Sequence, residues 1–218
     1  MKKLTILLFS VLLVSSLASC NLLFKSNTKS SNDRTAAKVK NGTVTIESIP
    51  KTYDAFEELY NEVAIYPEGC VALGLLAMEI YRVNPSVGVK CLKLVNTDTN
   101  YNMMMRRLPE IFREGDGYAR PYLVASYMDG ASPENGYNPT KPYVIRVQAN
   151  PAQRSQYSEI MQGTTYPMQV YCNGADTPWR SVTVIKLDGE RYYRMHESAS
   201  VTSQCKEIRR TQTFNGLN

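Results

Sequence analysis

Residues 70–81 read Cys-Val-Ala-Leu-Gly-Leu-Leu-Ala-Met-Glu-Ile-Tyr, and they are apolar around nearly the whole circumference of a helix. A helix of this kind must be buried on all sides inside a folded domain. Pro67, three residues earlier, suits the first turn of the same helix, where its missing N–H costs nothing. We therefore expect this helix to form the centre of the core, with the rest of the chain packed around it.

Three further helices are expected around this central one. Thr52 suits the N-cap of a helix that precedes it, because apolar residues then recur at helical spacing. Asn84 suits the cap of a third helix. A fourth helix follows Thr97 or Thr99, and Pro109 should kink or end it.

After Pro142 the apolar residues recur at every second position, which is typical of β-strands. The Asp188-Gly189 pair predicts a two-residue hairpin turn. The strands expected in this part of the chain are residues 143–148, 168–172, 181–187 and 190–195. Residues 44–47 predict one more short strand before the helices, at an edge of the sheet and ended by Pro50.

The fold class is therefore α+β, in which an N-terminal half of about four helices packs with a C-terminal antiparallel β-sheet of at least four strands. We expect one domain over residues 43–200. Its parts are a mainly helical segment, 43–117, a segment rich in Tyr, Pro and Gly, 118–142, and a β segment, 143–200.

The N-terminus has the layout of a secretory signal. Lys2 and Lys3 precede an apolar run of about 11 residues, which is too short to span a membrane. Residues 17–20, Leu-Ala-Ser-Cys, resemble the lipobox of bacterial lipoproteins, in which the cysteine takes a diacylglyceryl group and becomes the new N-terminus. We expect residues 1–19 to be a signal peptide and Cys20 to be the site of lipid attachment, with an ordinary cleaved signal as the alternative.

The segments at the two ends of the domain are polar. Residues 20–42 carry Cys20 and then mostly Ser, Asn, Thr and Lys, so we expect a flexible tether to the membrane. Residues 201–218 form a C-terminal tail, as a short helix or a frayed end. Removal of the signal leaves 23 basic against 20 acidic side chains, too mild an excess to favour a nucleic-acid partner.

Four cysteines follow Cys20, and in an exported chain they allow three sets of disulfide pairs that the sequence does not distinguish. Buried free thiols are the alternative, because free cysteine behaves as a small core residue. Their spacing contains no CxxC or His-rich pattern of a zinc site. These cysteines are Cys70, Cys91, Cys172 and Cys205.

The sequence contains no GxxxxGK[ST] phosphate loop, no GxSxG elbow and no HExxH helix, and it predicts no cofactor, no metal site and no catalytic residue. His196 is the only histidine, so a histidine-dependent mechanism must use it. A Cys-His hydrolase that pairs His196 with Cys172 or Cys205 is therefore the remaining enzymatic hypothesis.

Residues 118–143 contain a concentration of tyrosines among Gly, Pro and Asn. Aromatic rings that stack and amides that hydrogen-bond could form a surface for a glycan or a peptide. Alternatively the rings could fill the seam between the helical half and the sheet. The candidate ligand-binding residues are Tyr122, Tyr127, Asn135, Tyr137 and Tyr143.

The same region carries a family resemblance. Ser126-Tyr127, Gly130-Ala131, the run Pro-Glu-Asn-Gly-Tyr-Asn-Pro at 133–139 and Pro142-Tyr143 resemble the central signature of a bacterial family of unknown function. The resemblance implies an N-terminal helical part and a C-terminal part of strands, and no activity.

These observations predict a lipid-anchored cell-envelope protein on a cell membrane or outer membrane, facing the periplasm or the exterior. Without a catalytic motif, a protein-interaction or scaffolding module is favoured over an enzyme. The alternative is a glycan- or peptide-binding lipoprotein that uses residues 118–143, and a Cys-His hydrolase ranks last.

The lipobox hypothesis predicts the outcome of Cys20→Ser. This variant should lose metabolic labelling by palmitate and should leave the membrane fraction, because no other acylation site is expected. A Cys20→Ser protein that still fractionates with membranes, with no label on the wild type either, would contradict it.

Overall fold

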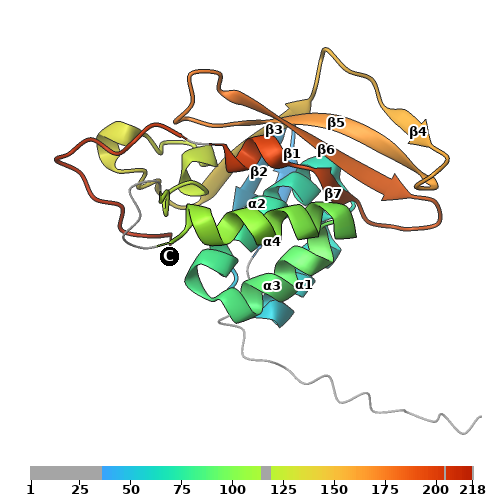
Figure 1. Ribbon diagram of the computed structural model, residues 1–218, viewed down its shortest axis with the longest axis horizontal. Helices are drawn as coiled ribbons and strands as arrows, with labels where there is room; N and C mark the ends of the chain where they lie inside the picture. The colour runs from blue at the N-terminus through green and yellow to red at the C-terminus, as the bar shows by residue number, and fades with distance from the viewer. Residues whose placement is uncertain (1–35, 114–118, 204, 218) are drawn as a thin grey trace, which may run out of the picture. The chain divides into compact units, whose positions relative to one another are not determined.

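The computed structural model describes residues 36–113, 119–203 and 205–217, and the predicted signal, Cys20 and the tether up to residue 35 lie outside them. The described residues belong to one compact unit. They confirm the α+β class, with four helices and a seven-stranded antiparallel sheet (Figure 1).

Three of the four helices begin at predicted caps. Thr52 Oγ1 accepts a hydrogen bond from the Ala55 N–H at 3.2 Å, and the side chains of Asn84 and Thr97 cap the third and fourth helices. Pro109 lies inside the last turn of the fourth helix, which ends at its C-cap Phe112. The helices are α1 (Tyr53–Val63), α2 (Pro67–Val83), α3 (Pro85–Val95) and α4 (Asp98–Ile111).

Helix α2 is the centre of the core, as the sequence predicts. Its residues from Gly69 to Ile80 are all buried, and α2 contacts β2, β3, β5, β6 and β7 as well as the neighbouring helices α1 and α3. Burial of an apolar side chain contributes about 1.5–3 kcal/mol, so this one helix accounts for a large share of the hydrophobic stabilisation.

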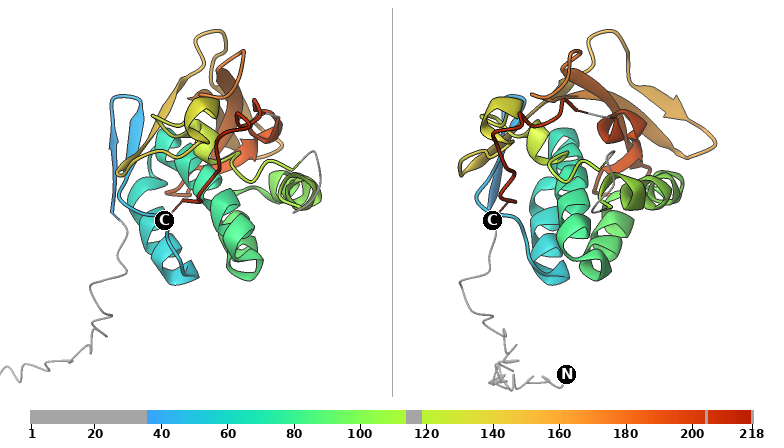
Figure 2. Two further views of the ribbon diagram at one scale, coloured as in Figure 1. Left: turned by 90° about the vertical axis from the view of Figure 1, so that its left-hand side faces the viewer. Right: turned by 60° about the vertical axis from the view of Figure 1, so that its left-hand side comes forward.

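The seven strands form one sheet in the order β1-β2-β3-β5-β6-β7, and β4 pairs with β5 outside this path. All neighbouring strands are antiparallel. The helices lie on one side of the sheet, as both views in Figure 2 show. The strands are β1 (Ala37–Lys40), β2 (Thr43–Ile46), β3 (Tyr143–Ala149), β4 (Gln156–Ser158), β5 (Gly163–Tyr171), β6 (Trp179–Leu187) and β7 (Arg194–Glu197).

Strand β1 corrects the predicted extent of the tether, because it lies inside residues 20–42. Asn41 and Gly42 both have positive φ, 49° and 77°, and they join β1 to β2 as a two-residue hairpin. This is the backbone conformation that Asn-Gly favours. Strand β1 is therefore the edge, and β2 lies between β1 and β3 rather than at the edge.

The β6–β7 connection also differs from the prediction. Pairing resumes at Ile185 with Arg194, so the loop is longer than Asp188-Gly189 alone. The Tyr193 N–H donates to the Ala64 carbonyl at 2.8 Å, which draws residue 193 to the end of α1 instead of into the ladder. One extra residue, His196, forms a bulge opposite Thr183 and Val184.

Residues 205–217 of the predicted tail form neither a helix nor a frayed end. After the 3₁₀ turn η3 (Ala199–Thr202), residues 205–217 run along the domain, and we call them the C-terminal strap. Cys205 and Leu217 in the strap are buried, and the Lys206 N–H donates to the Gly174 carbonyl at 2.7 Å. The strap is thus part of the folded unit.

Among the helices that the structure describes, none has the length and apolar character required to cross a bilayer.

The contact between α2 and α3 predicts the effect of Gly88→Ala. A Cβ at Gly88 would lie 2.1 Å from the Tyr81 Cα, so the two helices would have to move apart. We expect a loss of about 2–4 kcal/mol in the free energy of unfolding, measured by urea denaturation. Lys90→Ala in the same helix, at an exposed position, is the control and should change it by less than about 0.5 kcal/mol. Equal stability of the two variants would contradict the close packing.

Candidate functional site

The four candidate tyrosines are buried, and none has more than 7% of its surface exposed. The Tyr122 and Tyr137 rings stack with centroids 4.9 Å apart and planes 5° apart. The Tyr127 hydroxyl donates to the Val201 carbonyl at 3.0 Å, and the Tyr137 hydroxyl donates to the Lys206 carbonyl at 2.8 Å. Tyr143 pairs with Ile46 on the buried face of β3. The four rings therefore fill the seam, which corrects the expectation of an aromatic-lined surface.

Asn135 is exposed, but its side chain builds a turn. Its Oδ1 accepts from the Ser132 N–H at 2.9 Å, and its Nδ2 donates to the Gly130 carbonyl at 2.7 Å. These bonds close the short helix η2 (Pro133–Asn135). The amide therefore fixes the backbone between the buried tyrosines instead of joining them on a binding surface.

The Cys-His pair that a hydrolase would need is not formed. His196 is the bulge residue beside Thr183 and Val184 of β6, whereas Cys172 follows Tyr171, which pairs with Trp179 at the start of the same strand. Four residues of β6 separate the two places, about 13 Å along the strand. Cys205 lies beside Cys172 and not beside His196, because Lys206 bonds to Gly174.

His196 lines a recess of about 620 Å³ on the sheet, together with Arg154, Thr183 and Glu197. Its Nδ1 is shielded from solvent and makes no hydrogen bond within the described residues. The described residues contain no group of three His, Cys, Asp or Glu side chains arranged to hold a metal ion.

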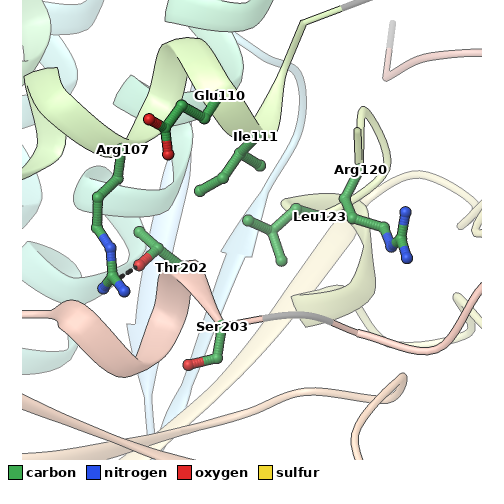
Figure 3. A pocket seen from close by; sticks show the side chains of 7 residues that line it. All are labelled: Arg107, Glu110, Ile111, Arg120, Leu123, Thr202 and Ser203. Carbon is green, nitrogen blue, oxygen red and sulfur yellow. Dashed lines mark hydrogen bonds between the residues drawn. The ribbon is translucent and has the colours of Figure 1, made fainter. Parts of the chain in front are cut away.

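A second recess, of about 400 Å³, lies between α4, η3 and Leu123 (Figure 3). Arg107 Nη1 donates to Thr202 Oγ1 at 2.8 Å and to the Ala199 carbonyl at 3.1 Å. Arg120 points away from Arg107 in Figure 3, and its Nη2 pairs with Glu207 at 2.9 Å. Arg107 thus joins η3 to α4, Arg120 joins the strap to the segment after α4, and the two guanidinium groups do not converge on one ligand.

The face of the sheet that points away from α2, which we call the outer face, carries a cluster of aromatic and cationic side chains. The Arg146 guanidinium carbon lies 3.6 Å from the centre of the Tyr171 ring. Tyr171 meets Trp179 edge to face, with centroids 5.2 Å apart. All three side chains are partly exposed. Cation–π and edge-to-face contacts each contribute on the order of 1 kcal/mol, so the rings have a fixed arrangement.

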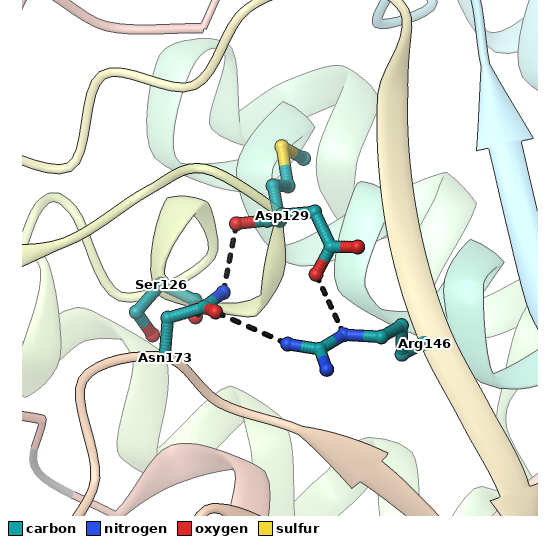
Figure 4. Close-up of polar contacts among 5 residues, drawn as sticks. Ser126, Asp129, Arg146 and Asn173 are labelled. Carbon is teal, nitrogen blue, oxygen red and sulfur yellow. Dashed lines mark hydrogen bonds and ion pairs between the residues drawn. The ribbon is translucent and has the colours of Figure 1, made fainter.

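Arg146 is held from its other side by two polar partners (Figure 4). Its Nε pairs with Asp129 Oδ1 at 2.7 Å, and its Nη2 donates to Asn173 Oδ1 at 3.4 Å. Asn173 Nδ2 in turn donates to the Met128 carbonyl at 2.8 Å. This network fixes the guanidinium while 38% of the Arg146 side chain remains exposed.

A row of amides continues the outer face beside this cluster. Gln148 Nε2 donates to Gln169 Oε1 at 3.3 Å, and Ser181 pairs with Gln169 across β5 and β6. This cluster was not predicted as a site from the sequence. The alternation in β3 does place Arg146 and Gln148 opposite the buried residues, but the partners of Arg146 depend on the register of β3 with β5.

Glu79 is the most deeply buried carboxyl group of the described residues, with no exposed surface. Burial raises the pKa of Glu79, while its hydrogen bonds to Arg82, at 2.6 and 2.9 Å, and to the Leu217 backbone oppose the rise. Arg82 also lies over the Phe214 ring at 5.4 Å. Glu79 therefore joins α2 to the end of the strap and is closed to a substrate.

A family model described as "Domain of unknown function (DUF6935)" matches residues 48–209, more than half of the chain. No curated protein matches the chain, and no solved structure matches it.

The burial of Glu79 predicts a pH dependence for Glu79→Gln. Because the pKa of Glu79 is higher in the folded chain than in the unfolded chain, folding is favoured when the carboxyl is protonated. The quantity to follow is the free energy of unfolding of the wild type minus that of Glu79→Gln. This difference should be greatest below the pKa of Glu79 in the unfolded chain, about 4.3, and should fall as the pH rises through its higher pKa in the folded chain. Urea denaturation between pH 4 and pH 8 measures this difference.

Glu58→Gln, the same substitution at an exposed position of α1, is the matched control for this measurement. If this difference instead rises with pH for Glu79, the pairing with Arg82 outweighs the effect of burial on the pKa of Glu79, and the prediction is contradicted.

Proposed function

We propose that this chain, which belongs to the family described as domain of unknown function DUF6935, is a lipid-anchored cell-envelope protein that binds a partner protein without catalysis. The lipid on Cys20 would hold the domain at the membrane surface, since each buried methylene of an acyl chain contributes about 0.8 kcal/mol. The partner would contact the outer face of the sheet.

The observation that carries this proposal is the cluster of Arg146, Tyr171 and Trp179. Arginine, tyrosine and tryptophan are the residue types that most often dominate the binding energy of protein interfaces. Here the three lie together on the outer face, and each is partly exposed. Helices α1 to α4 lie on the other side of the sheet (Figure 1).

The cluster is also held in place before a partner binds. Arg146 is fixed between Asp129, Asn173 and the Tyr171 ring. A side chain that is already ordered loses less conformational entropy on association, about 0.5–1.5 kcal/mol for each immobilised residue. The rigid backbone of paired β-strands under these side chains adds to the same effect.

A second candidate function, glycan binding, is favoured by the amide row next to the rings. Gln148 and Gln169 place hydrogen-bonding groups beside Tyr171, an arrangement suited to sugar hydroxyls and a stacked sugar ring. This alternative moves the glycan site from residues 118–143 to the outer face. Binding of the full chain to a glycan array, abolished by Trp179→Ala, would support it over a protein partner.

Photo-crosslinking tests the protein partner. A photoreactive residue replaces Ser181, an exposed position of the outer face, and in a second protein it replaces Glu62 of α1, on the helical side. We expect a discrete protein adduct from position 181 alone, in intact cells. The partner protein found in the adduct is then purified without the crosslink, and its affinity for the full chain is measured by calorimetry.

Trp179→Ala should weaken this affinity by at least about 10-fold, because truncation of an interface tryptophan typically costs more than 1 kcal/mol. Tyr157→Ala removes an aromatic side chain that is 55% exposed on β4, away from the cluster, and it should leave the affinity unchanged. Equal adducts from both positions, or equal affinities of both variants, would contradict the proposal.

A further inference from the structure

Cys172 and Cys205 lie in one buried cluster, although 33 positions separate them in the sequence. Cys172 follows the end of β5, and Cys205 lies near the start of the C-terminal strap. Their exposed fractions are 1% and 5%. Both are free thiols in the structure.

The two thiols share one hydroxyl neighbour. Ser126 Oγ lies 3.3 Å from Cys172 Sγ. Burial, and then the proximity of Cys172, raise the pKa of the Cys205 thiol to about 11, while hydrogen bonds to Ser126 and Tyr137 act in the opposite direction. Both thiols therefore lie near the Ser126 hydroxyl.

The backbone supports the same juxtaposition. The Lys206 N–H donates to the Gly174 carbonyl at 2.7 Å, so the residue after Cys205 is bonded to the residue two positions after Cys172. The Tyr137 hydroxyl donates to the Lys206 carbonyl at 2.8 Å and closes the cluster from the third side. This backbone contact places Cys205 and Cys172 on two neighbouring segments, within one and two residues of the bonded pair.

The other two cysteines cannot pair with each other in this fold. Helices α2 and α3 are in close contact where Gly88 meets Tyr81. Cys70 lies eleven residues before Tyr81 on α2, but Cys91 lies only three residues after Gly88 on α3. The difference corresponds to about 12 Å along the helix axes. A disulfide needs Cα atoms within about 7 Å.

We propose that Cys172 and Cys205 are a disulfide-forming pair, which fastens the C-terminal strap to the end of β5 while Cys70 and Cys91 remain thiols. This pairing is one of those that the sequence left open. It concerns atoms inside the domain and does not depend on the outer face or on its partner.

The reaction is a thiol–disulfide exchange with a small-molecule or protein disulfide as the oxidant. The Cys205 thiolate attacks one sulfur of the oxidant, which forms a mixed disulfide and releases one thiolate. The Cys172 thiolate then attacks the Cys205 sulfur, which forms the Cys172–Cys205 bond and releases the second thiolate. The two cysteines lose two electrons and two protons, and the oxidant becomes two thiols.

Because both sulfurs are buried once the strap has docked, exchange occurs during folding. The full chain, in detergent, is therefore refolded from denaturant with oxidised glutathione as the probe, and remaining thiols are alkylated. Trypsin then yields residues 155–180 with Cys172 and residues 195–206 with Cys205. We expect these two peptides joined, with a mass two hydrogens below their sum, and alkylated Cys70 and Cys91.

The oxidised chain should unfold at a melting temperature on the order of 5 to 15 °C above the reduced chain, since the bond constrains the unfolded state. Cys70→Ala and Cys91→Ala should each keep the joined peptides. Cys205→Ser should lose them and should give no rise in melting temperature on oxidation. Refolded protein in which Cys172 and Cys205 are both alkylated, or in which either is joined to Cys70 or Cys91, would overturn the proposal.

Discussion

The structure depends on the burial of α2 from Gly69 to Ile80. The helix contacts five strands and two other helices, so a charged side chain in this buried stretch has no access to solvent. Glu79 nevertheless lies there, near the end of the helix. Arg82, one turn later, supplies two hydrogen bonds, and the end of the strap supplies the Leu217 backbone and the Phe214 ring. A buried carboxylate without such partners would cost several kcal/mol. The C-terminal strap is therefore required by the core, although its sequence is polar.

The same requirement explains the tyrosine-rich segment. Tyrosine brings a large apolar ring with a hydroxyl that needs a partner when buried. Tyr127 and Tyr137 reach the carbonyls of Val201 and Lys206, so the rings fill the seam while their hydroxyls attach η3 and the strap. The segment that looked most like a binding site is thus the junction between the two halves. The outer face, where Arg146, Tyr171 and Trp179 meet, is the surface that we propose for contact with a partner.

The parts of the fold that local chemistry decides could be predicted from the sequence. The all-round apolar helix and the caps at Thr52, Asn84 and Thr97 belong to this group. Strand β1 was not predicted, although Asn41-Gly42 is a strong signal for a hairpin turn. The lysines beside this pair are typical of a polar tether, and the segment was assigned to the tether for that reason. The fates of the tyrosines and of Arg146 depend on which distant segments meet them. Neither the path of the strap nor the register of β3 with β5 is a local property, so these could not be predicted.

The central functional claim is that the outer face is covered by a partner in the cell. Hydroxyl-radical footprinting measures it directly, by comparing the oxidation of Trp179 and Tyr171 in intact cells with that in the purified full chain, and with Tyr157 as an internal reference. The account predicts that Trp179 and Tyr171 are protected in cells while Tyr157, on the protruding β4, is oxidised equally in both. Equal oxidation of all three residues in cells and in the purified protein would contradict it.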